Sequence, residues 1–129
     1  MAKHLAVFDS EAAKAIFDGK KKIEGRFSQI RIVPFLAVAV GDTVYIKISG
    51  EQIVGQFIVD RVFYFDHPRH EELEDIKKKY GKMLSLSETF WKRREKVNYV
   101  TLMFIRSVSK LLIAPEIPKR DLRSWVVLD

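Results

Sequence analysis

The stretch from residue 53 to residue 65 most constrains the fold, because it is too long and too irregular for one flat strand. Its sequence, IVGQFIVDRVFYF, alternates apolar and polar residues and then loses this phase between Phe57 and Val59. One inserted residue moves every later side chain to the opposite face of a sheet. A β-bulge or a barrel corner is therefore predicted near Gly55 or Ile58.

Shorter runs on both sides of this stretch have the alternation that is typical of strands. They cover residues 4–8, 22–27, 43–49, 99–108 and 124–128. Tight glycine turns separate several of them, as at Gly41-Asp42 and Ser49-Gly50. Short strands joined in this way favour a small closed or half-closed β-barrel.

Two helices are indicated by their end signals. The first is predicted to begin at Asp9 or Ser10 and to end before Gly19, where a glycine adopts positive φ without strain. The second covers residues 70–81 and ends at Gly81, with acidic residues in its first turn and lysines in its last.

A third helix, over residues 87–96, follows a capping-box pattern formed by Ser85 and Glu88. With the second helix it makes a two-helix insertion in an otherwise β-rich chain. The predicted fold class is therefore α+β: a mostly antiparallel β-barrel with one N-terminal helix and this insertion.

Size and composition indicate one domain over residues 1–129, since 129 residues is typical of a single domain and 47% of them are hydrophobic. The absence of cysteine excludes disulfides, thiol nucleophiles and zinc–thiolate sites. The longest apolar stretch, residues 32–40, is about half the length of a membrane span, and the N-terminus lacks a signal-peptide pattern. We expect a cytoplasmic protein that does not bind a membrane.

Positive charge is concentrated in one stretch of a chain whose net charge is +6. Residues 77–96 contain eight Lys and Arg against two acidic residues, whereas residues 1–76 contain ten against twelve. A basic cluster of this kind suits a nucleic acid or another polyanion, because it neutralises phosphates and releases their counterions. A solvated helix face explains the same charges equally well.

Three charged residues before and within the second predicted strand form the main candidate site. Glu24 and Arg26 lie on the same face of a strand, about 6.5–7 Å apart, and Lys21 precedes them at a bend. Lys21 supplies a point charge, Glu24 an acceptor for amino groups, and Arg26 a fork of donors for a phosphate or a base edge. The alternative is a charge ladder on an edge strand that prevents aggregation.

These residues form the pattern G-x-K-x-x-E-x-R, beginning at Gly19, and the pattern resembles the signature of ASCH domains, a branch of the PUA-like superfamily. The segment GDTVYIKISG, residues 41–50, also resembles a barrel strand of that family, and the order of elements matches from about residue 4 to residue 108. The resemblance implies a PUA-like barrel whose cleft is lined by the motif residues. It further implies RNA binding and, in some members, an enzyme that acts on modified nucleosides.

One branch of similar small proteins hydrolyses the acetyl amide of N4-acetylcytidine, using the motif lysine, a threonine where this chain has Glu24, and a distant glutamate. Lys21 matches that pattern but Glu24 does not, because a carboxylate is a poor substitute for a hydroxyl nucleophile. In an enzyme, Lys21 and Glu24 would be the catalytic residues, with Glu24 positioning a water. A second carboxylate would come from Asp60 or Asp66, and their spacing does not select between them.

The third predicted helix carries the remaining candidate binding residues. Its cations are expected to follow backbone phosphates, with Lys92 and Lys96 on one face. Trp91 and Phe90 either stack on bases or, as aromatic residues more often do, anchor the helix in the core. The flanking cations are Arg93 and Arg94.

No metal or cofactor is predicted. His67 and His70 lack a third and fourth ligand at suitable spacing, and the chain has no phosphate-binding glycine loop or nucleophile elbow. The leading hypothesis is an RNA-binding protein that holds a nucleotide or base in its barrel cleft and phosphates on the basic helical segment. Hydrolysis of a modified nucleoside and a protein-interaction module are the alternatives.

Overall fold

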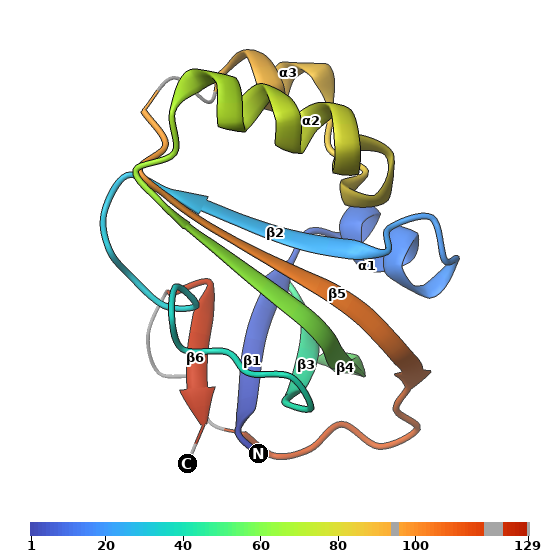
Figure 1. Ribbon diagram of the computed structural model, residues 1–129. Helices are drawn as coiled ribbons and strands as arrows, with labels where there is room; N and C mark the ends of the chain where they lie inside the picture. The colour runs from blue at the N-terminus through green and yellow to red at the C-terminus, as the bar shows by residue number, and fades with distance from the viewer. Residues whose placement is uncertain (94–95, 118–122, 129) are drawn as a thin grey trace.

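The computed structural model describes residues 1–93, 96–117 and 123–128. In these residues six strands form one curled sheet, and three helices accompany it (Figure 1). The helices are α1 (Ser10–Phe17), α2 (His70–Leu84) and α3 (Glu88–Lys92). The strands are β1 (Lys3–Phe8), β2 (Ile23–Ser28), β3 (Thr43–Ile48), β4 (Ile53–Asp66), β5 (Tyr99–Lys110) and β6 (Trp125–Leu128).

The six strands form a half-barrel rather than a closed barrel. Their order is β2-β5-β4-β3-β1-β6, so β2 and β6 are the two edges of the sheet. Only β1 and β3 pair in parallel, and the other neighbours are antiparallel. The predicted α+β class is confirmed, with three helices beside a half-closed barrel.

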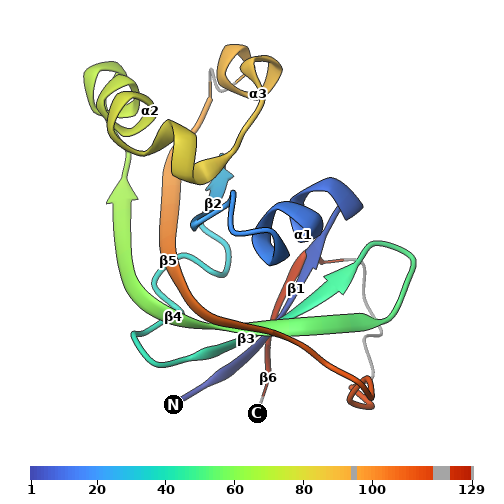
Figure 2. The same cartoon turned by 90° about the vertical axis from the view of Figure 1, so that its right-hand side faces the viewer.

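The predicted irregularity in residues 53–65 is confirmed as a pair of register shifts. Pairing between β4 and β5 shifts between Gln56 and Ile58 and again between Val59 and Arg61. In Figure 2 both strands turn sharply along their length, as bulged strands do. Gly55 lies beside the first shift, and a Cβ there would be 2.5 Å from the Phe17 ring and 2.6 Å from the Ser109 carbonyl oxygen. Only glycine permits this close approach of α1 and β5 to β4.

The first helix begins and ends where its sequence predicts. The Asp9 side chain accepts a hydrogen bond from the Ala12 backbone N–H at 2.8 Å, and Gly19 follows the helix with a φ of 78°. Both are the expected devices for satisfying the unpaired groups at helix ends.

The second helix continues beyond its predicted end at Gly81. It runs to Leu84 and is followed by Ser85 in the left-handed region, with φ 54°. The Leu84 side chain is completely buried in the core beneath the helix. Burial of that side chain outweighs the modest cost of one glycine inside a helix.

The third helix is shorter than predicted and has a different cap. Ser87, not Ser85, is the N-cap: its hydroxyl oxygen accepts from the Phe90 N–H at 3.1 Å. The helix ends at Lys92, so Lys96 does not share a helical face with it. Like charges four residues apart destabilise a helix, which disfavours its continuation to Lys96.

Two hydrophobic cores lie along the sheet. One packs α1 against strands β1, β3, β4 and β6. It includes Phe8, Ile16, Phe57 and Trp125. The other packs α2 and α3 against β2 and β5 and includes the residues Ile23, Leu73, Ile76, Leu84, Trp91 and Leu102. Within the described residues no helix has the length and apolar character needed to cross a membrane.

A buried polar chain joins the C-terminal strand to the turn before β3. Trp125 Nε1–H donates to His4 Nδ1 at 3.1 Å, so the opposite imidazole nitrogen, Nε2, carries the proton and donates to Asp42 Oδ2 at 2.8 Å. The Asp42 carboxylate also accepts from the backbone N–H groups of Ala2 and Ala39. Burial by itself raises the pKa of Asp42, but the hydrogen bonds from His4, Ala39 and Ala2 outweigh it and lower the pKa below its ordinary value.

We expect Asp42→Asn to destabilise the protein by about 1–3 kcal/mol at neutral pH, because the amide loses charge-assisted hydrogen bonds. A lowered folded-state pKa stabilises the fold above the ordinary value of 3.8, and this contribution is lost as the pH falls through the folded value. The difference in unfolding free energy between wild type and variant, measured by urea denaturation, should therefore narrow below about pH 4. A difference that stays constant into stronger acid contradicts this assignment.

Candidate nucleic-acid interface

The three motif residues meet in one buried chain of ion pairs, which we call the motif clasp (Lys21, Glu24 and Arg26). Lys21 Nζ lies 3.2 Å from one Glu24 carboxylate oxygen, and Arg26 Nε lies 2.9 Å from the other. Lys21 and Glu24 are only 3% and 5% exposed. Two cations thus share one nearly buried carboxylate, although the Arg26 side chain itself is 18% exposed.

Arg26 connects edge strand β2 to β1 and to the residue before β6, at the other side of the half-barrel. It projects from edge strand β2 and donates to the Val7 carbonyl of β1 at 3.0 Å and, more weakly, to the Ser124 carbonyl at 3.4 Å. Its guanidinium group lies over the rings of Phe8 and Trp125, 5.0 Å and 5.2 Å from their centroids. Cation–π contacts and charge-assisted hydrogen bonds therefore take the place of the missing backbone ladder.

Lys21 connects the clasp to the insertion. Its ammonium group donates to the Leu84 carbonyl oxygen at the end of α2. The next residue, Lys22, donates its backbone N–H to the Met83 carbonyl at 2.8 Å. The last carbonyls of a helix have no partner within the helix, and a cation there interacts favourably with the helix dipole.

The predicted polar face of the motif strand is thus turned into the protein. Alternation correctly places Glu24 and Arg26 on one side, but that side faces the interior of the half-barrel. The alternation within one strand does not reveal that the whole sheet curls over this face. Whether these side chains also contact a nucleotide stays a prediction.

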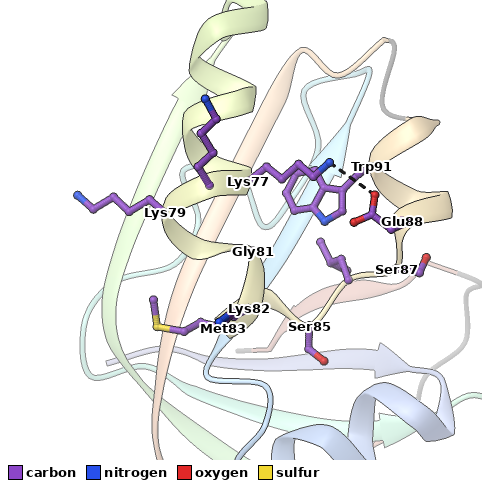
Figure 3. A pocket seen from close by; sticks show the side chains of 11 residues that line it. Lys77, Lys79, Gly81, Lys82, Met83, Ser85, Ser87, Glu88 and Trp91 are labelled. Carbon is purple, nitrogen blue, oxygen red and sulfur yellow. Dashed lines mark ion pairs between the residues drawn. The ribbon is translucent and has the colours of Figure 1, made fainter.

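A separate basic groove lies between α2 and α3 (Figure 3). We call it the α2–α3 groove; its volume is about 840 Å³. Four lysines, a glutamate, two serines and a tryptophan contribute to its lining. The full set is Lys77, Lys78, Lys79, Gly81, Lys82, Met83, Ser85, Leu86, Ser87, Glu88 and Trp91.

Most of the positive charge in the α2–α3 groove is not neutralised. Lys77 lies 3.6 Å from Glu88, the acidic residue of the lining, and Figure 3 shows this pair across the groove. Lys79 lies 5.3 Å from the Tyr80 ring centroid. Among the described residues, neither Lys78 nor Lys82 has an ion-pair partner. Four cations against one carboxylate make this surface attractive to an anion.

The aromatic residues of the third helix belong mainly to the core. Trp91 is 5% exposed and packs edge-on against Phe27 and Phe90. Trp91 therefore anchors α3 in the core, which was the alternative to base stacking. It also forms part of the groove lining.

The other predicted phosphate contacts lie beside a smaller cavity. Arg93 and Lys96 help to line a hollow of about 290 Å³ together with Phe27 and Phe90. Lys92 is exposed at the end of α3, and Arg94 lies outside the described residues.

The predicted site did not include Lys82, Ser85 and Ser87, which line the α2–α3 groove. The i, i+4 spacing of Lys78 and Lys82 was the signal that could have revealed the groove.

The carboxylates suggested as partners for Glu24 do not approach the clasp. Asp60 and Asp66 are exposed, and they pair with Arg106 and His67 respectively. In the described part of the chain, no three His, Asp or Glu side chains are grouped closely enough to hold a metal ion.

Comparison with protein-family models finds no match, and comparison with curated proteins finds none either. Solved structures do match. The crystal structure of ASCH from Zymomonas mobilis has a TM-score of 0.76 and 19% identity, covering 98% of this chain and 87% of that one. The chain has the ASCH domain fold.

Two further structures agree with this result. A point mutant of the Zymomonas mobilis ASCH protein has a TM-score of 0.66 and 22% identity, covering 84% of this chain and 71% of that one. A hypothetical protein has a TM-score of 0.53 and 17% identity, covering 83% and 97%. The resemblance found in the motif is therefore confirmed at the level of the ASCH fold.

We expect Glu24→Ala to destabilise the protein by about 3–5 kcal/mol, because it leaves the buried Lys21 ammonium group and the partly buried Arg26 without their carboxylate. Urea denaturation at neutral pH measures the effect. Asp60→Ala is the matched control, since it removes an exposed carboxylate that lies 3.4 Å from an arginine. The control should cost no more than about 1 kcal/mol. Equal losses in the two variants would contradict a buried, stabilising role for the motif clasp.

Proposed function

We propose that this protein binds RNA and that the α2–α3 groove holds the backbone phosphates. The proposal rests above all on the groove lining, in which four lysines and one glutamate border a volume of about 840 Å³. Phosphate oxygens are the most abundant acceptors of a nucleic acid, and lysine binds them as a point charge. The ASCH fold supports the proposal, because its family is a branch of the PUA-like domains to which RNA binding is attributed.

Other parts of the predicted site extend this surface. Arg93 and Lys96 line the neighbouring hollow, so RNA leaving the groove would meet further cations there. Ser85 and Ser87 contribute polar groups to the groove itself. The apolar part of the lining, which includes Met83 and Leu86, offers a surface for a base or ribose.

Hydrolysis of an acylated nucleoside has less support. It requires Lys21 and Glu24 to reach a substrate, whereas both are nearly buried and bound to each other. The carboxylates that might assist them are exposed and paired elsewhere.

A salt titration tests the proposed RNA binding. We expect a fluorescein-labelled oligouridylate to bind with an affinity that falls steeply between about 50 mM and 200 mM KCl, as phosphate contacts require. Lys78→Ala and Lys82→Ala should each weaken binding and lower the slope of log K against log salt by about 0.7–1. Fluorescence anisotropy measures both quantities.

Lys3→Ala is the control for this experiment. Lys3 is an exposed lysine at the start of β1, at the opposite end of the molecule from α2 and α3 (Figure 1). Its removal changes the net charge equally but should leave the slope unchanged. The proposal fails if the wild-type protein does not bind at low salt, or if all three variants behave alike.

Removing the negative charge of the groove glutamate should strengthen RNA binding, whereas removing its lysines should weaken it. Glu88 is 75% exposed at its side chain and lies 3.6 Å from the Lys77 ammonium group. Glu88→Gln should therefore strengthen RNA binding severalfold, because it removes the repulsion of phosphate and releases Lys77. Unchanged or weakened binding, measured by the same anisotropy titration, would place the RNA elsewhere.

A further inference from the structure

Lys21 and Lys22 hold the part of α2 that forms one wall of the groove. The Lys21 ammonium group and the Lys22 backbone N–H donate to consecutive carbonyls, those of Leu84 and Met83. Lys82, Met83 and Ser85 lie in or directly after this last turn, and all three line the α2–α3 groove.

The holding segment is itself fixed on several sides. Lys21 donates its backbone N–H to the Ala15 carbonyl of α1 at 2.9 Å. Lys22 accepts at its own carbonyl from the Ile105 N–H of β5 at 3.0 Å. Residues 21 and 22 are therefore fixed to α1 and to β5. Because they also bind the last carbonyls of α2, the position of the end of α2 depends on these elements.

The remaining members of the clasp fix the direction of the Lys21 side chain. Glu24 binds Lys21 with one oxygen and Arg26 with the other, and Arg26 in turn donates to the carbonyls of Val7 in β1 and Ser124. A buried ammonium group with a carboxylate on one side and a helix carbonyl on the other has little freedom to rearrange. It is also shielded from the groove, at 3% exposure.

We propose that Lys21 is a positioning residue for RNA binding. It sets the end of α2, and with it the width of the α2–α3 groove, without touching the RNA. This inference rests on the proposed function and gives the ASCH motif an indirect part in it.

The test separates affinity from the number of phosphate contacts. Lys21→Met keeps the length of the side chain but removes the ammonium group that caps α2. At a temperature where the variant is fully folded, we expect it to bind the oligouridylate roughly tenfold more weakly. The slope of log K against log salt should not change, because no phosphate contact is lost. Lys82→Ala, in contrast, should lower that slope.

Hydrogen exchange provides a second measurement that needs no RNA. In Lys21→Met the amide of Ser85, which donates to the Gly81 carbonyl at 3.1 Å, should exchange faster relative to the amides of β5. Glu24→Gln serves if Lys21→Met does not fold, because it keeps a hydrogen-bonding group beside Lys21. Its effects on affinity and exchange should be in the same direction and smaller.

Three results would overturn the proposal. A slope lowered as much as in Lys82→Ala would show that Lys21 itself contacts phosphate. Unchanged affinity in folded Lys21→Met would show that the groove does not depend on it. If the wild-type protein binds no RNA, the proposed function fails and the positioning role falls with it, whereas faster exchange at Ser85 would still establish the cap on α2.

Discussion

The sharing of one buried carboxylate by two cations is the interaction on which the rest of the structure depends. Glu24 lies between Lys21 and Arg26, and each cation continues to a different part of the molecule. Arg26 reaches β1 on the other side of the half-barrel, and Lys21 reaches the end of α2. Because a buried ion pair is worth little without such additional hydrogen bonds, the connections at both ends make this arrangement stabilising.

Positive charge is handled in two different ways in this chain. Inside the half-barrel, cations are paired, hydrogen-bonded and shielded, so they determine geometry and respond weakly to salt. On the insertion, Lys78 and Lys82 are exposed and have no ion-pair partner among the described residues, so their charge is open to screening by salt. Net charge alone does not distinguish these two populations, although it points to the segment that lines the α2–α3 groove.

The sequence was most informative where local chemistry decides the outcome. The cap at Asp9, the turn at Gly19 and the slipped phase of β4 follow from interactions between near neighbours. It was less informative where burial by distant residues decides, as at the end of α2, where Leu84 is drawn into the core. The same reason applies to Glu24: alternation gives its side of the strand, but only the curl of six strands turns that side inward.

The pairing of β1 with β6 brings the two ends of the described chain together. Lys3 lies opposite Leu128 in the ladder, and the start of β1 and the end of β6 lie at the end of the molecule away from α2 and α3 (Figure 1). A fusion partner attached at either terminus would therefore leave the basic surface accessible. Because the ends are neighbours, a circularly permuted chain with a short linker between them and new termini in a surface loop would retain the same architecture.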